Sequence, residues 1–241
     1  VNAGFVSNIE VLHGPASALY GSSAIGGVVA MRSVDPRLLT RSAGQGGRLV
    51  SNWRDDDSSL TATAIHAVSS DSLAVLAGLS GAKGHEAAAS AADTNLDRRD
   101  FRNRSALIKL VADNELGNGW RATLYHREGD VHSDATSMLG SGRFRSSTAL
   151  VGDDEYDTNI ASVEFNFMSD KWFADDGVVR AWYQSADFAQ RTHDERALAT
   201  RPVAIERLFS FRQDALGLET NLQKTVVTGQ VSHRLSYGFE A

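Results

Sequence analysis

The sequence contains no cysteine among its 241 residues, which excludes disulfide bridges and thiolate metal sites. It also contains no run of about 18 apolar residues, so we expect no transmembrane helix. This second absence leaves one kind of membrane protein open, because the strands of a membrane β-barrel are only half apolar. No initiator methionine or signal-like apolar segment opens the chain, and we therefore expect a processed or truncated N-terminus.

The sequence also lacks the short motifs that mark nucleotide sites and common enzymes. In the glycine-rich stretch 8–31, Gly14 and Gly21 are too far apart for a phosphate loop, and no lysine follows them. The dinucleotide fingerprint G-x-G-x-x-G is absent as well. His85 and Glu86 begin a possible zinc motif, but position 89 is alanine. With no set of nucleophile, base and orienting group in view, we predict that the protein is not an enzyme.

The stretch 8–31 predicts a strand, a short helix and a second strand. Residues 9–12 form a brief apolar run. Pro15 suits the first position of a helix over 16–20, and Gly21 suits the left-handed residue that ends it. Residues 28–31 form the second apolar run. The two glycines before this run allow a bulge or a close backbone approach.

The string IEVLHGPASALYGSSAIGGVVAM resembles the last part of the plug domain of TonB-dependent outer-membrane receptors. That family has a Glu-Val-Leu-Arg-Gly-Pro run, a Ser/Ala-Leu-Tyr-Gly helix and an Ile-Gly-Gly-Val strand in this order. The positions that match are Glu10, Gly14, Pro15, Leu19, Tyr20, Gly21, Gly26, Gly27 and Val28. His13 stands where the family has arginine, so an ion pair from that arginine to the barrel is not implied here.

Beyond Asp35 and Pro36 the sequence alternates between apolar and polar residues, which is typical of strands with two different faces. In IASVEFNF, residues 161, 163, 165 and 167 are apolar, and 162, 164 and 166 are polar. No strongly amphipathic helix intervenes, which favours an antiparallel meander over a βαβ protein. We expect about nine strands, near 47–54, 59–69, 72–82, 102–112, 119–129, 156–168, 177–188, 211–224 and 229–240.

The connections between these strands alternate in length. We expect long third, fifth and seventh connections at 83–101, 130–155 and 189–210, and short or medium ones between them. Outer-membrane barrels have short periplasmic turns and long extracellular loops, and this pattern follows that rule. The first connection, 55–58, is a short exception on the outer side. A soluble β-sandwich is the alternative, but it rarely needs long loops on one side only.

The predicted fold is therefore all-β: a partial antiparallel transmembrane β-barrel preceded by the C-terminal piece of a plug domain. We place the plug piece at 1–36 and the N-terminal part of the barrel at 37–241. Large plugged transporters close with 22 strands, and open sheet edges are not tolerated in lipid. Nine strands cannot close such a barrel, so we expect the chain to be a fragment.

Two sets of residues are candidates for binding. His85, His132 and His193 fall in the three expected long loops, where each could ligate haem iron or another metal; the alternative is a solvated loop histidine. The basic run at the foot of an outer loop could contact lipopolysaccharide phosphates, because arginine binds phosphate in a bidentate manner. This run comprises Arg98, Arg99, Arg102 and Arg104.

The resemblance implies import across the outer membrane of a Gram-negative bacterium, energised by the TonB–ExbB–ExbD complex. In that family TonB pairs by strand addition with a periplasmic segment that lies before this stretch. The implied partners are the membrane, its lipopolysaccharide and a haemoprotein or siderophore ligand, without nucleic acid. No cofactor is expected to stay bound, because haem or a ferric chelate would be the transported substrate.

The continuation DPRLL followed by GGRLVSNW resembles the haem and haemoglobin receptor branch. Haem, free or taken from haemoproteins, is therefore the expected cargo. Ferric siderophores or cobalamin are the alternative within the family. A non-transporting surface adhesin is the alternative from a different class.

Overall fold

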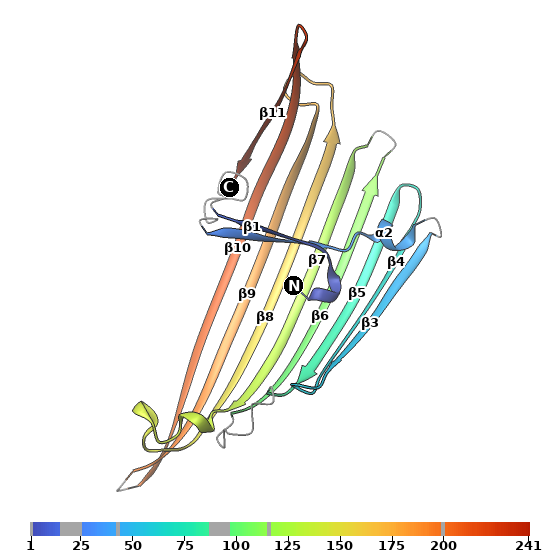
Figure 1. Ribbon diagram of the computed structural model, residues 1–241. Helices are drawn as coiled ribbons and strands as arrows, with labels where there is room; N and C mark the ends of the chain where they lie inside the picture. The colour runs from blue at the N-terminus through green and yellow to red at the C-terminus, as the bar shows by residue number, and fades with distance from the viewer. Residues whose placement is uncertain (1, 15–25, 42–43, 87–96, 115–116, 199–200) are drawn as a thin grey trace.

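The computed structural model describes residues 2–14, 26–41, 44–86, 97–114, 117–198 and 201–241. These residues are nearly all antiparallel β-structure, in one two-stranded and one nine-stranded sheet (Figure 1). The small sheet pairs β1 (Val6–His13) with β2 (Gly27–Ser33). We call the nine-stranded sheet the wall; its strands are β3 (Gln45–Arg54), β4 (Ser59–Ser69), β5 (Leu73–Gly84), β6 (Arg98–Asp113), β7 (Gly119–Asp134), β8 (Ser147–Met168), β9 (Asp176–Ala197), β10 (Pro202–Thr228) and β11 (Val231–Glu240).

The helices are short and lie at the ends of strands. They are α2 (Pro36–Thr40), η1 (Ala3–Phe5), η2 (Thr136–Met138) and η3 (Gly142–Phe144). None of the helices among the described residues has the length and hydropathy that a membrane crossing requires.

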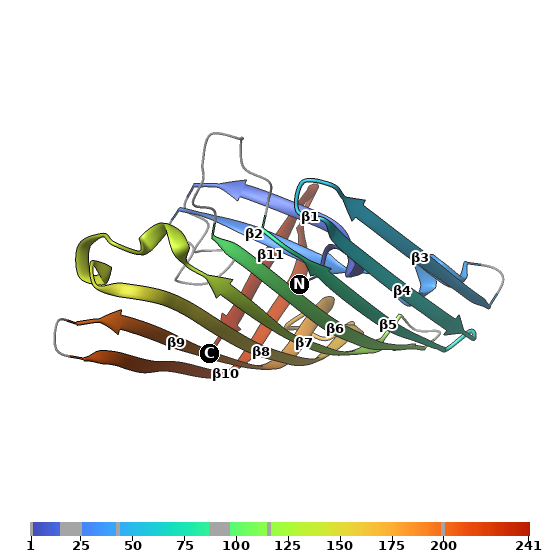
Figure 2. The ribbon, with the colours of Figure 1, turned by 90° about the horizontal axis from the view of Figure 1, so that it is seen from below.

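Each wall strand pairs with its neighbours in chain order, so the wall is a continuous meander. Its connections fall at two ends. The loop end carries 55–58, 85–97, 135–146 and 198–201, and the turn end carries 70–72, 114–118, 169–175 and 229–230. Figure 2 shows that the wall is curved and that β1 and β2 lie on its concave side, which we call the inner face. This arrangement confirms the predicted partial barrel.

The outer face of the wall carries an apolar belt. Residues that are opposite each other in the strand register share a face, and on this face they are mostly large, exposed apolar side chains. Leu49 is 78% exposed, Leu79 69% and Leu216 78%. The belt comprises Leu49, Leu79, Ile108, Leu124, Val163, Phe165, Phe167, Leu216, Leu218, Val231 and Leu235. So much apolar surface facing outward is typical of a barrel wall in lipid.

The inner face holds the buried core, which joins the N-terminal segment to the wall. Phe5, at the end of η1, is 0% exposed and packs edge-to-face on Tyr125 at 6.4 Å between ring centroids. Gly78 leaves room for this ring, because a Cβ there would lie 2.8 Å from the Phe5 Cε1 atom. Val34, which follows β2, and four buried residues of the wall strands complete the cluster: Ile65, Ala67, Leu76 and Leu107.

Helix α2 links β2 to the wall, and the sequence pattern did not predict it. The Asp35 carboxylate caps the helix by accepting a hydrogen bond from the Arg37 amide at 2.8 Å, and Pro36 occupies the first turn. Gly46 lets the helix lie against β3, because a Cβ there would collide with the Leu39 carbonyl oxygen. The predicted domain boundary at 36/37 falls at the start of this helix and stays a prediction.

The wall strands are longer than expected at the loop end. The third connection, 85–97, is long, and the fifth is limited to 135–146. The expected long seventh connection is wrong, because β9 and β10 continue until only 198–201 lies between them. Consequently His132 lies in β7 and His193 in β9, rather than in loops. Alternation could not reveal these extensions, because both of their faces carry polar and charged side chains.

Candidate functional site

The small sheet carries the part of the glycine-rich motif that the structure describes. His13 in β1 pairs with Gly27 in β2. Gly27 adopts φ +144°, and a Cβ there would lie 2.5 Å from the Leu12 carbonyl oxygen, so a side chain is excluded at this position. Gly14 has φ +95°. Glu10 lies in β1 and Gly26 precedes β2, whereas Pro15, Leu19, Tyr20 and Gly21 lie outside the described residues.

A cavity of about 640 Å³ lies on the inner face between η1 and the loop end of the wall. We call it the arginine cup, because Arg48, Arg54 and Arg127 line it from β3 and β7. Asn2 and Gly4 form its floor: the Asn2 side chain donates to the Ser80 hydroxyl at 2.9 Å. Polar residues and a few apolar ones complete the lining, among them Val50, Asn52, Thr61, Phe101 and Asn103. The cup therefore offers many hydrogen-bonding groups.

The three arginines of the cup differ in their partners. Arg54 forms an ion pair with Asp56, and Asp57 lies 3.9 Å away, so its charge is compensated. Arg48 donates a hydrogen bond to the Gly4 carbonyl oxygen at 2.6 Å. Arg127 donates to the Tyr156 hydroxyl at 3.2 Å, and its guanidinium lies 4.9 Å from the Tyr156 ring centroid. Among the described residues, neither Arg48 nor Arg127 forms an ion pair with a carboxylate.

A second inner-face cavity, of about 950 Å³, separates the small sheet from strands β6 to β9. On the side of strands β7 to β10, four charged residues form a row of ion pairs, which we call the ion ladder. Arg121 lies 3.4 Å from Glu164, Glu164 lies 2.6 Å from Arg180, and Arg180 lies 3.0 Å from Glu219. The small sheet presents its polar side to this ladder through Asn8, Glu10 and Arg32. The small sheet and this part of the wall therefore face each other across the cavity mainly through polar side chains.

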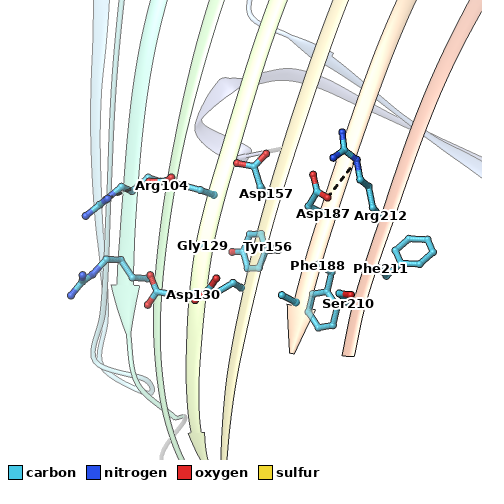
Figure 3. Close-up of a pocket in the computed structure, with 14 residues that line it drawn as sticks. Arg104, Gly129, Asp130, Tyr156, Asp157, Asp187, Phe188, Ser210, Phe211 and Arg212 are labelled. Atoms are coloured by element: carbon cyan, nitrogen blue, oxygen red, sulfur yellow. Dashed lines mark hydrogen bonds and ion pairs between the residues drawn. The ribbon is translucent and has the colours of Figure 1, made fainter. Parts of the chain in front are cut away.

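On the outer face, a cavity of about 800 Å³ lies on the loop-end side of the apolar belt (Figure 3). Arg104 pairs with Glu128 at 3.2 Å, and Arg212 lies 3.8 Å from Asp187. Figure 3 shows Asp157 between Arg104 and Asp187, and Asp130 lines the same cavity. The surface just beyond the belt is thus densely charged with both signs.

Of the four arginines predicted to contact lipopolysaccharide, the strand register puts three on this outer face. Arg98, Arg102 and Arg104 alternate along the loop-end part of β6 and share its outer side. Arg99 points to the opposite face. Its backbone amide donates to the Glu86 carboxylate at 2.9 Å.

The loop-end parts of β8, β9 and β10 form a rim, residues 147–157, 187–197 and 202–212. A buried carboxylate joins its strands: Asp194 is 0% exposed and accepts hydrogen bonds from Ser147 at 2.6 Å and Arg196 at 2.7 Å. Arg207 donates to the same carboxylate at 3.2 Å. Arg196 above all, with Ser147 and Arg207, lowers the pKa of Asp194 to about 2, so this group is ionised at neutral pH.

The three candidate histidines do not converge. His85 pairs with Asp100, His132 with Asp153 at 2.7 Å, and His193 with Glu195 at 3.3 Å. Since the register places His132 and His193 on the outer face, neither points into the arginine cup. The hydrogen bond to Asp153 raises the pKa of His132. No group of three metal-binding side chains occurs in the part of the chain that the structure describes.

Sequence reasoning did not single out Arg48 and Arg127, the two unpaired cations of the cup. They lie far apart in the sequence, and only the register of five strands brings them to one cavity. A signal was available, because both fall on the polar side of alternating strands. The pattern could not show that Arg54 pairs with carboxylates, whereas Arg48 and Arg127 bind neutral groups.

Residues 1–28 match the family model described as the TonB-dependent Receptor Plug Domain. No curated protein matches the chain. The matched segment and the curved β-wall indicate, in general terms, a TonB-dependent receptor or transporter. Such a plug domain implies the outer membrane of a Gram-negative bacterium and energy coupling through TonB. The match covers the small sheet up to the start of β2.

Proposed function

We propose that this protein is an outer-membrane receptor that imports an iron source, with haem or haem from haemoproteins as its cargo. One observation carries the proposal: a plug segment is packed on the inner face of a β-wall whose outer face is an apolar belt. This is the arrangement that a plugged barrel needs in lipid. The loop end then faces outward, because outer-membrane barrels have their longer connections outside.

In this orientation the two inner-face cavities lie along one possible route. The arginine cup lies beside η1, toward the loop end of the wall, and it receives the cargo. The ion ladder lies deeper in the wall, beside the small sheet. The polar side chains that line this cavity let the plug move when TonB pulls it, because no large apolar area must be exposed there. Energy for this movement comes from the TonB–ExbB–ExbD complex.

The resemblance of 35–39 and 46–53 to the haem receptor branch supports haem as the cargo. His85, His132 and His193 are the proposed cargo contacts. All three belong to the loop-end side of the wall, where a docking haemoprotein would first touch the receptor. A ferric siderophore or cobalamin is the second candidate cargo, because the cup's many polar groups suit an oxygen-rich ligand equally well.

We also propose lipopolysaccharide as a partner of the outer face. Arg98, Arg102 and Arg104 lie just beyond the apolar belt, at the level where lipid phosphates meet a barrel. Arg99 does not contribute to this surface, because the strand register places it on the opposite face.

The experiment uses the complete product of the gene that encodes this chain, expressed in the outer membrane. Purified receptor is titrated with hemin while the Soret band is recorded, and haem-dependent growth is compared with and without TonB. Saturable binding and TonB-dependent growth are expected. Tight binding of a ferric siderophore, together with no Soret change on addition of hemin, would make the siderophore the cargo in place of haem. TonB-independent behaviour with every cargo would favour a non-transporting adhesin.

A further inference from the structure

We infer that the arginine cup recognises the anionic groups of the cargo through Arg48 and Arg127, so that the receptor selects a polyanionic chelate. This inference rests on the proposed function and names the substrate class of the same route. The cup is expected to reject cationic chelates of similar size.

The charge balance of the cup supports this inference. The chain as a whole has a formal net charge of −6, yet this cavity collects three arginines and a single carboxylate, Asp57. Asp57 and Asp56 together compensate Arg54. Among the residues that the structure describes, two positive charges, on Arg48 and Arg127, are therefore uncompensated in a partly enclosed cavity. A low-dielectric wall strengthens the field of such charges and raises the local concentration of anions.

Both side chains are held in place by neutral groups. The Arg48 guanidinium is anchored on the Gly4 carbonyl oxygen, which uses one of its five N–H donors. Arg127 lies on Tyr156, and the Tyr156 hydroxyl in turn fills the space that a side chain at Gly129 would need. Neutral anchors fix the position of each guanidinium and leave its charge free for a ligand.

The positions of the two arginines indicate two separate anionic groups. Arg48 lies on β3 and Arg127 on β7, which are four strand spacings apart, or about 19 Å along the sheet. The floor formed by η1 lies between them. A ligand must therefore carry charges on opposite sides of its body, with Phe101 and Val50 available for an apolar part. A volume of about 640 Å³ is within the usual range for small-molecule sites.

The test compares iron chelates of opposite charge on the complete receptor. The probes are hemin and ferric citrate, which are anionic, and ferrioxamine B, which is cationic. Affinities are measured by fluorescence quenching, and uptake of labelled iron is measured with and without TonB. We expect an anionic probe to bind, with TonB-dependent uptake, and the cationic probe to bind at least tenfold more weakly.

Substitutions then assign the selectivity to the cup. Arg48→Gln and Arg127→Gln should each weaken binding of the anionic probe by about 10- to 100-fold, because each removes a charge-assisted hydrogen bond. Arg127→Lys should restore most of the loss, which a purely structural role would not explain. Arg212→Gln is the matched control, because Arg212 is a paired arginine on the outer face and does not line the cup; it should change affinity by less than threefold.

The outcomes separate this inference from the proposed function. TonB-dependent uptake of ferrioxamine B alone, or unchanged affinity in both glutamine variants, would overturn the anionic cup and leave the receptor function standing. Loss of binding in Arg212→Gln as large as in Arg127→Gln would also overturn it. An absence of TonB-dependent uptake with every probe would instead refute the proposed function.

Discussion

Replacing Asp194 by asparagine should loosen the rim of the wall without unfolding the rest. Asp194 is the buried carboxylate that joins β8, β9 and β10 through Ser147, Arg196 and Arg207. The Asp194→Asn side chain keeps its shape and one acceptor oxygen, and it loses the negative charge. The two guanidinium groups then lose their common partner.

The size of the effect follows from the contacts. Hydrogen bonds to charged groups contribute about 1.5–3 kcal/mol each, and breaking a buried ion pair costs about 3–5 kcal/mol. Here the cost is smaller, because the side chains of Arg196 and Arg207 are 21% and 46% exposed and can turn to water. We expect a local loss of about 2 kcal/mol, which corresponds to about 30-fold faster opening of the rim.

Hydrogen exchange followed by mass spectrometry measures this opening peptide by peptide. Amides in 187–197 and 202–212 should exchange about 30-fold faster in Asp194→Asn, and those of β4 and β5 should be unchanged. Asp187→Asn is the control, since Asp187 is 48% exposed and its arginine is 3.8 Å away. Equal rim exchange in the wild type and Asp194→Asn would refute the reasoning.

The same carboxylate gives the rim a defined response to acid. Its pKa is about 2 in the folded protein and 3.8 without these partners. Because the folded value is the lower one, the stabilisation is complete above the unfolded pKa and is lost as the pH falls through the folded one. After correction for intrinsic rates, rim exchange should therefore be constant from pH 7 to 5 and rise only below about pH 4.

Three other substitutions test separate parts of the structure. Gly46→Ala should destabilise the protein by about 1–3 kcal/mol, because the new Cβ collides with the backbone of α2; thermal melting in detergent measures this. Val163→Arg on the apolar belt should cost about 2–4 kcal/mol when folding into lipid bilayers is measured. NMR should show that the pKa of His132 lies above its ordinary value of 6.5 and that Asp153→Asn lowers it. The His132–Asp153 pair stabilises the folded protein at low pH, and this stabilisation is lost as the pH rises through the raised pKa of His132.

Each of these three has its own control or contradicting outcome. Gly81→Ala should be neutral, because nothing lies within 4 Å of a Cβ at that position. Ser162→Arg, next to Val163 but on the inner face, should be tolerated in bilayers; equal costs at the two positions would contradict the assignment of faces. An unchanged His132 midpoint in Asp153→Asn would show that the hydrogen bond does not control this titration.

Alternation in the sequence predicted the order and faces of the wall strands, because a half-apolar strand in lipid needs a different residue type on each side. The predicted strand ends were wrong beyond the apolar belt, where the strands no longer need one apolar face. Beyond the belt both faces of β9 and β10 meet water or polar groups, so residues such as His193 and Asp194 show no period-two pattern. Helix α2 was missed for another reason: its five residues are too few for a helical period, although the Asp35–Pro36 start is a recognisable signal.

The candidate site was less predictable than the fold. Single histidines and arginines in a sequence show neither which face they occupy nor which charge accompanies them. His132 acquires its partner from the register of β7 on β8, and Arg48 acquires its position from the packing of η1 on the wall. Contacts between residues so far apart along the chain carry no local signal.

The unequal lengths of the wall strands have a consequence for how cargo can arrive. Followed across the register from the end of β3, the level of Arg54 corresponds to Gln190 on β9, and β9 continues for another seven residues to Ala197. At about 3.3 Å per residue, the wall is higher there by about 23 Å along the strand direction. The loop end of the described wall is therefore uneven: its edge is low at β3, beside the arginine cup, and high at β9. Among the described strands, the low edge at β3 hinders a bulky carrier of the cargo least, and the high edge at β9 limits how far it can pass.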